Sequence, residues 1–142
     1  MPLSYEECLR QGLLRRIPPS REKASQSIQK AQRWLAESQQ PLTSGASGAS
    51  VLAAHLAMFH AARALLFRDG FREKSHACVA RYLDQYVTKN ALEQKWVDLL
   101  DHARETRHDD QYDLSFVSTR EDAERAVHTA GEFLKRLQEL VK

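Results

Sequence analysis

The sequence predicts an all-α protein, a helical bundle with four long core helices and additional shorter ones. Apolar residues recur at spacings of three and four along each long segment, which is the period of an amphipathic helix. No segment shows the strict apolar–polar alternation that is typical of strands. Residues that start and stop helices separate the segments. These three observations favour helices throughout.

Composition bounds the size of the molecule and the kind of partner it can attract. With 142 residues, of which 42% are hydrophobic, the chain can fill one core, so residues 1–142 are expected to form a single domain. The 21 basic and 19 acidic residues leave a formal net charge of only +2. A broad attraction to nucleic acid or to anionic lipid therefore does not follow from the total charge. Any basic site must be local.

In the N-terminal part, a short amphipathic helix is predicted over residues 4–14. Pro18 and Pro19 then redirect the backbone. Ser20 is a suitable cap for a longer helix with one apolar stripe, which places that helix on the surface. Residues 41–50 are rich in Ser and Gly, offer little to bury and are interpreted as a mobile connection.

The remaining segments give four further helices. The third is expected from a Ser50 cap to about Asp69, apolar around most of its circumference and therefore central, with Gly70 ending it. The next elements follow in order: a helix opened by Ser75 and closed by Lys89 and Asn90, one over residues 91–112, and one over residues 119–140 with Thr119 or Ser118 as its N-cap.

Cysteine usage and hydropathy suggest a soluble cytoplasmic protein. Cys8 and Cys78 lack the spacing of metal ligands, and each falls on an apolar helix face, so reduced packing residues are expected rather than a disulfide. No leader-like segment opens the chain. The most apolar stretch, residues 51–67, is interrupted by two histidines and an arginine and is expected to be too short for a membrane span.

A polar cluster at residues 102–113 concentrates titratable groups at the end of the fifth helix. Arg107 falls where the apolar stripe of that helix would continue by one more turn, so it needs a partner. Arg104 and His108 are four residues apart, and together with Arg107 they could bind an anion. The alternative is structural: Arg107 could form a salt bridge with an acid of its own chain, namely Glu105, Asp109 or Asp110.

The other histidines are weaker candidates for functional residues. The segment Lys74-Ser75-His76 precedes a helix whose start could bind an anion, with a plain turn capped by Ser75 as the alternative. His60 lies in the central helix, where a buried neutral imidazole is the commoner arrangement. The spacing of histidines and acids does not suggest a metal site, and no cofactor is expected.

The segment AMFHAARALL, residues 57–66, followed by Gly70 and then Lys74-Ser75-His76, resembles the small prokaryotic HEPN proteins. These are compact helical domains of nucleotide- and RNA-directed systems. The resemblance extends over most of the chain, including the helix that ends in Arg107 and Tyr112. It implies a HEPN-like helical bundle and a homodimer. The Arg107 stripe also calls for a facing surface, so we expect the dimer interface to involve the fifth helix.

In HEPN ribonucleases, the resemblance implies, each subunit contributes an Arg followed after four to six residues by a His. The pair promotes metal-independent attack of an RNA 2′-hydroxyl on the adjacent phosphate, which suits a cation and a near-neutral base. This sequence departs from that spacing. The nearest pairs are Arg104 with His108 and Arg72 with His76, and Tyr112 stands where the histidine would follow Arg107. Unperturbed tyrosine titrates near pH 10 and is a poor base.

Three functional hypotheses follow. The chain could be the HEPN partner of a minimal nucleotidyltransferase in a toxin–antitoxin or defence pair, with Tyr112 as the residue that the transferase modifies. It could be a non-catalytic module that binds RNA or nucleotide or mediates assembly. It could be a ribonuclease with a relocated histidine. Arg107, His108 and Arg104 are the candidate catalytic residues, and the candidate binding or modification residues are Tyr112, Asp109, Lys74 and His76.

Overall fold

Helices dominate the protein, as the sequence predicted. The structure, a computed structural model, describes residues 3–112, 114–115 and 117–142, and for residues 109–111 it describes the backbone alone. The elements in the described chain are α1 (Tyr5–Arg10), β1 (Leu14–Arg16), α2 (Arg21–Ser44), α3 (Ser47–Asp69), β2 (Phe71–Glu73), α4 (His76–Thr88), α5 (Gln94–Tyr112) and α6 (Arg120–Val141). The all-α bundle is confirmed, with one two-stranded sheet added to it.

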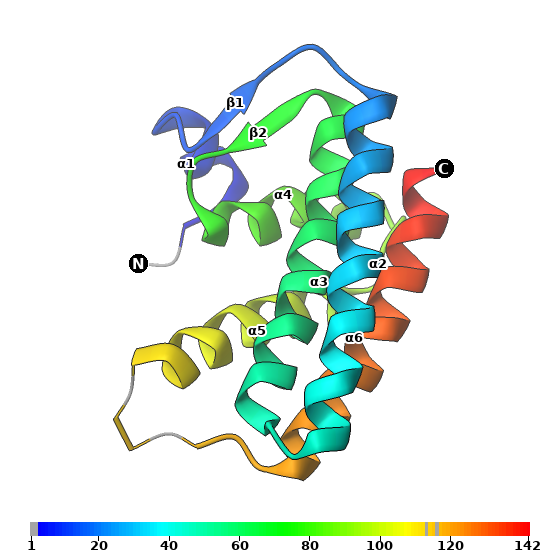
Figure 1. The fold of residues 1–142 in the computed structure, drawn as a ribbon. Coiled ribbons are helices and arrows are strands. Elements are labelled where there is room, and N and C mark those ends of the chain that lie inside the picture. Colours follow the sequence, from blue (N-terminus) through cyan, green and yellow to red (C-terminus); the bar gives the residue numbers. More distant parts are fainter. Residues whose placement is uncertain (1–2, 113, 116) are drawn as a thin grey trace.

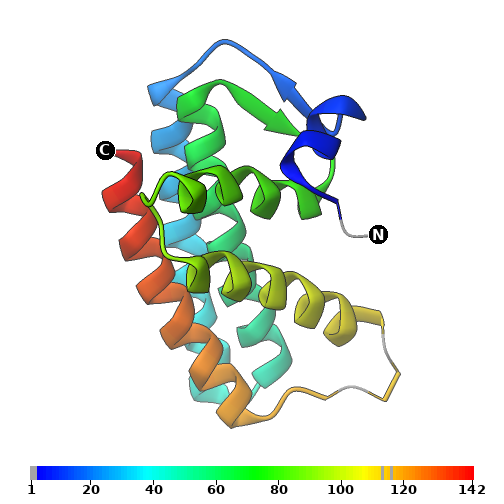
Figure 2. The same ribbon diagram turned by 180° about the vertical axis from the view of Figure 1, so that it is seen from behind.

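The three longest helices, α2, α3 and α6, run side by side, and α4 and α5 lie across one side of α3 (Figures 1 and 2). Helix α3 packs against all four of the others, which confirms its predicted central position. Small residues allow this close packing, since Ala54, Ala57, Ala61 and Ala62 of α3 are fully buried. Helix α2 keeps most of its polar residues exposed, as expected for a surface helix.

Helix α3 is longer than predicted, because it begins at Ser47 and runs to Asp69. By length and composition it could cross a membrane, so the expectation that this stretch is too short was wrong. Within the protein, however, 67% of its most apolar part is buried against other elements. The core helix of a folded bundle has the same properties.

The segment interpreted as a mobile connection is mostly helical. Helix α2 continues through Pro41 to Ser44, Gly45 adopts a left-handed conformation, and α3 begins at Ser47. Ser50 is therefore inside α3 and not its cap. Its buried hydroxyl donates a hydrogen bond of 2.6 Å to the Ser38 carbonyl oxygen of α2. This contact ties the two helices together at the turn, which a count of turn-forming residues could not reveal.

Several predicted helix ends are confirmed. Ser20 caps α2 by accepting a hydrogen bond from the Lys23 amide at 3.0 Å. Thr119 caps α6 within a reciprocal capping box with Asp122. Gly70 ends α3 with φ +90°. Ser75 occupies the N-cap position of α4, although its side chain makes no capping hydrogen bond.

The first helix is shorter than predicted, because α1 ends at Arg10 and the chain then enters a strand. Strands β1 and β2 pair antiparallel, with Leu14 opposite Glu73 and Arg16 opposite Phe71. Three-residue strands are too short to produce a recognisable alternation in the sequence. The sheet fixes the segment between α3 and α4, which carries Lys74 and leads into His76 at the start of α4.

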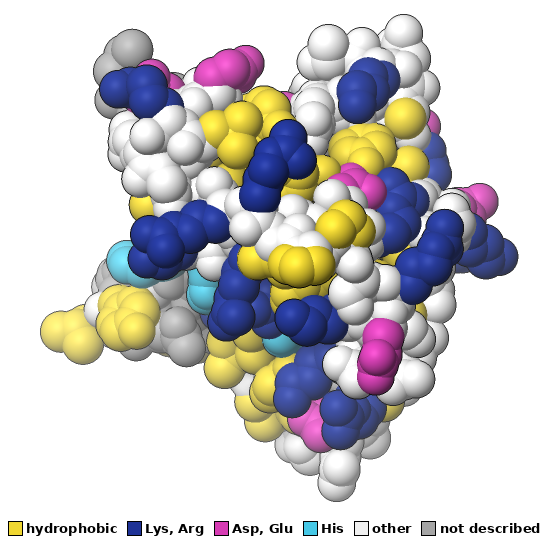
Figure 3. All heavy atoms as spheres, turned by 90° about the horizontal axis from the view of Figure 1, so that it is seen from above, with side chains coloured by type: hydrophobic (Ala, Val, Ile, Leu, Met, Phe, Trp, Pro, Cys, Tyr) yellow, Lys and Arg dark blue, Asp and Glu magenta, His cyan; other side chains and the backbone are white. Residues whose placement is uncertain are grey.

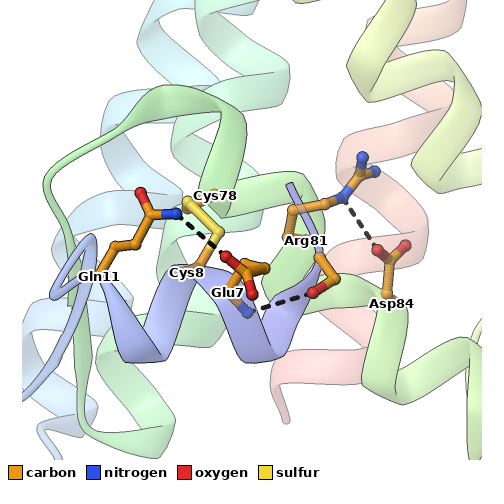
Figure 4. The surroundings of a disulfide bond; sticks show 7 residues. Glu7, Cys8, Gln11, Cys78, Arg81 and Asp84 are labelled. Atoms are coloured by element: carbon orange, nitrogen blue, oxygen red, sulfur yellow. Dashed lines mark hydrogen bonds and ion pairs between the residues drawn. A yellow bond between two sulfur atoms is a disulfide. The ribbon is translucent and has the colours of Figure 1, made fainter. Parts of the chain in front are cut away.

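The expectation of reduced cysteines was also wrong. Cys8 of α1 and Cys78 of α4 form a disulfide, with their Cα atoms 6.0 Å apart (Figure 4). Both are fully buried, so they do pack in the core as their apolar helix faces suggested. The sequence could not show that α1 lies on α4, because 70 residues separate the two cysteines.

Candidate functional site

Helix α5 crosses α3 beside the start of α4, and polar side chains from all three helices meet there around an aromatic ring. We call this set the Arg107 site: His55 and Phe59 of α3, His76 of α4, and Arg104 and Arg107 of α5. The side chains line a narrow pocket of about 20 Å³, which holds little more than one water molecule. A larger anion would therefore bind at the mouth of this pocket.

Arg107 and His76 contact each other directly. The Arg107 Nη2 atom lies 3.2 Å from His76 Nδ1. A guanidinium can only donate, so His76 Nδ1 accepts and the imidazole is neutral. Burial and the neighbouring Arg107 charge both lower the pKa of His76. Two residues predicted separately as site residues, 31 positions apart, thus form one pair.

The Arg107 site has more hydrogen-bond donors than the described protein uses. The Arg104 Nε atom is buried and makes no hydrogen bond with the described residues. Asp101, which also lines the pocket, bonds instead to Arg81 Nη2 at 2.6 Å. Buried donors normally find partners, so the unmatched Arg104 nitrogen suggests that an acceptor is supplied from outside the chain.

His55 and Phe59 are the residues of the Arg107 site that sequence reasoning missed, and His55 is the polar one. It is 8% exposed, and its Nδ1 atom makes no hydrogen bond with the described residues. Burial, helped by the charges of His102 and Arg107, lowers its pKa to about 4. A histidine one turn before Phe59 on a mostly apolar helix was the available signal, but the sequence did not show that α5 would cover that turn.

Behind His55 lies a second and larger cavity, of about 400 Å³, between α3, α5 and α6. Its floor is apolar, with Val51 and Met58, and its rim is polar, with His102 and Thr106. A cavity of this size and composition is typical of small-molecule sites. His55 lines both spaces.

The other predicted site residues lie elsewhere. His108 does not line the Arg107 pocket, and its ring packs at 5.0 Å from the ring of Tyr112. Tyr112 is 69% exposed at the end of α5. Lys74 is exposed on the turn before α4, where its amide donates to the Leu13 carbonyl oxygen. The side chain of Asp109 lies outside the described residues.

No set of three or more potential ligands in the part of the chain that the structure describes could hold a metal ion. The groups that the Arg107 site itself offers are guanidinium and imidazole. Two arginines can bind phosphate or carboxylate oxygens, and a neutral histidine can accept a proton.

The family of this bundle is given by a comparison with known protein families, in which the HEPN domain matches residues 24–140. The chain belongs to the HEPN family. The match runs from the first turns of α2 to the end of α6 and so includes every residue of the Arg107 site. A comparison with curated proteins found no match. As a HEPN domain, the protein belongs to a group related to nucleotides and RNA.

Proposed function

We propose that this HEPN protein binds phosphate groups of RNA or of a nucleotide at the Arg107 site. The observation that carries the proposal is the Arg107–His76 contact beside the unmatched Arg104 nitrogen. Guanidinium groups bind phosphate through charge-assisted hydrogen bonds, and Arg often binds it through two of them at once. A phosphate held by Arg107 at the mouth of the pocket would lie beside Arg104, whose buried Nε has no acceptor among the described residues.

The biological setting that fits this site is a toxin–antitoxin or defence-type system, in which the protein acts as a homodimer. Family membership supports this setting, because it relates the chain to nucleotides and RNA. Apolar side chains beyond the Arg107 site also favour a facing surface. Tyr112 is 69% exposed, Leu114 103% and Val117 79%, which is unusual for large apolar residues.

A nucleotidyltransferase is the partner we propose for this system, with Tyr112 as its target. The exposure of Tyr112 supports the proposal, since a modifying enzyme must reach the hydroxyl. Adding a phosphate-bearing group at the end of α5 would change the charge near the arginines. Intact-mass measurement after co-expression with the transferase should show one nucleotidyl addition, absent in Tyr112→Phe. Equal addition to both proteins would exclude Tyr112.

The protein could be a ribonuclease or a non-catalytic binding module. The spacing between arginine and histidine in the sequence favours the binding module. The His expected four to six residues after Arg107 is replaced by Tyr112, and His76 reaches the arginine from a different helix. Binding requires only the two cations. Cleavage would further require that the neutral His76 accept the proton of the 2′-hydroxyl.

One experiment tests binding and cleavage together. End-labelled RNA is incubated with wild-type protein, Arg107→Ala, His76→Ala and His108→Ala in excess chelator. We expect no cleavage, and we expect RNA affinity about tenfold lower in Arg107→Ala because a charge-assisted hydrogen bond is removed. His108→Ala is the matched control and should bind like wild type. Unchanged binding by Arg107→Ala would refute the proposal, and cleavage that disappears in His76→Ala would replace binding with catalysis.

A further inference from the structure

A second group of cations lies on the other side of Phe59 from the Arg107 site. We call it the basic groove. It is a shallow depression of about 340 Å³ between α2, α3 and β2, and its basic residues are Lys23, Lys30, His60, Arg63 and Arg72. No carboxylate is among the residues that line it. Figure 3 views the end of the molecule that carries β1 and β2, and dark-blue basic side chains dominate there over scattered magenta acids.

The charges of the basic groove are mostly uncompensated. Arg63 donates to Glu73 at 3.0 Å, but no carboxylate among the described residues pairs with Lys30 or Arg72. Arg72 also stands directly opposite Arg15 in the two-stranded sheet, and both side chains are exposed. Like charges at paired positions destabilise a sheet. Folding does not need this arrangement, so a ligand is the better explanation for it.

The positive charges of the basic groove also affect the pKa of a histidine that lines it. Burial, together with the charges of Arg63 and Lys30, lowers the pKa of His60 to about 4. His60 is therefore neutral near pH 7. The other basic residues of the groove are two lysines and two arginines, and of these Arg63 is paired with Glu73.

Phe59 joins the basic groove to the Arg107 site. Its ring centroid lies 4.5 Å from that of His76, a residue of the Arg107 site, and 5.3 Å from that of His60, a residue of the groove. The Arg63 guanidinium carbon lies 5.9 Å from the same ring. The two sets of cations therefore lie on either side of one aromatic ring and are contributed by α5, α3, β2 and α2.

We propose that the basic groove binds the phosphate backbone of single-stranded RNA whose chain continues from the Arg107 site. The proposal deepens the proposed function, and rests on it for the Arg107 end, by naming a polymer as the ligand. A mononucleotide presents its charge at one point, whereas these cations extend over four elements. A backbone with one charge per nucleotide matches that extent, and such binding tracks a basic groove.

The test compares fluorescein-labelled RNAs of about 4 and about 20 nucleotides, measured by anisotropy between roughly 50 and 300 mM salt. The groove variant is Lys30→Ala with Arg72→Ala. We expect it to bind the long RNA at least about tenfold more weakly at low salt, with a salt slope reduced by about 0.7 for each phosphate that the variant no longer neutralises. Binding of the short RNA should not change.

The matched control is Lys95→Ala with Lys135→Ala, which removes two exposed lysines from α5 and α6 and should behave like wild type. Equal weakening by the control and the groove variant would overturn the proposal, as would a groove variant that binds long RNA like wild type. Competition by poly-glutamate as strong as that by unlabelled RNA would overturn it in favour of an acidic protein partner.

The two proposals fail in different ways. If Arg107→Ala abolishes short-RNA binding while RNA length adds no affinity, the groove proposal alone is wrong. If the groove variant weakens long-RNA binding and Arg107→Ala has no effect on either RNA, the Arg107 proposal alone is wrong.

Discussion

At the scale of single residues, the side chains around His55 combine burial with unmatched polar atoms. His55 Nδ1 and Arg104 Nε are both buried without a hydrogen-bond partner in the described chain, and both residues line the same pocket. Such groups cost stability unless a ligand or water satisfies them. Their pairing at one place agrees with the tendency of perturbed, unmatched polar groups to collect at functional sites.

Because His55 is neutral in the folded protein, it makes the stability of the fold depend on pH. The pKa of His55 is about 4 in the folded protein, below the ordinary value of 6.5. Between these two values the unfolded chain binds more protons than the folded one, so stability present above about pH 6.5 falls as the pH falls toward 4. From pH 7 to pH 5 we expect His55 alone to contribute a loss of about 2 kcal/mol in the free energy of unfolding.

Urea denaturation of wild type, His55→Gln and His128→Gln at both pH values checks this expectation. His55→Gln should lose less stability between pH 7 and pH 5 than wild type, because the titrating group is gone. His128 is exposed on α6, so its variant serves as the control and should keep the wild-type difference. An equal pH dependence in all three proteins would contradict the assignment.

At the scale of elements, the sequence located helices well wherever the signal is local. Ser20, Thr119 and Gly70 mark helix ends through contacts within a few residues, and each was identified. The errors arose where contacts are distant. Ser50 was taken for a cap because its bond to Ser38 of another helix leaves no trace in its neighbours. Strand β1 was not predicted, because its partner β2 is more than fifty residues away.

Dependence on contacts between distant residues also limits how much of the Arg107 site could be predicted from the sequence. Arg107 and His76 each stood out, the first by interrupting an apolar stripe and the second by its place before a helix. Their contact depends on how α5 crosses the start of α4, which is a property of the packed helices. The cations of the basic groove come from three elements and follow no pattern along the chain.

Gly70 joins two of these elements, and its conformation is required. It has φ +90°, and a Cβ atom there would lie 2.7 Å from the Ile17 carbonyl oxygen and 2.9 Å from Cγ of Pro19. Gly70→Ala should therefore lower the free energy of unfolding by about 3 kcal/mol or more, through both backbone strain and the clash. Gly45 has a similar φ of +87°, but nothing lies within 4 Å of its Cβ position.

Gly45→Ala is thus a control that introduces the backbone strain without the steric clash. It should lower the free energy of unfolding by only about 1 to 2 kcal/mol. Thermal and urea unfolding of both variants measure the difference. Equal losses of unfolding free energy in the two variants would show that the clash with residues 17–19 does not add to the destabilisation.

At the scale of the whole molecule, the protein consists of a helical bundle and an N-terminal segment attached to it. The HEPN match begins in α2, whereas α1 and β1 precede it. Two connections attach this segment: the pairing of β1 with β2, and the Cys8–Cys78 disulfide between α1 and α4. Both connections lie close to the turn that carries Lys74 and His76, so the segment supports one side of the Arg107 site.

The disulfide should stabilise the fold mainly by restricting the unfolded chain, because its two cysteines are 70 positions apart. We expect the Cys8→Ser, Cys78→Ser double variant to lose about 2 to 4 kcal/mol in the free energy of unfolding. A phosphine reductant should destabilise wild type by a similar amount and leave the double variant unchanged. Thiol titration in denaturant should find none without prior reduction and two after it. Two free thiols in the untreated protein would contradict the bond, and the attachment of α1 would then rest on packing and on the sheet alone.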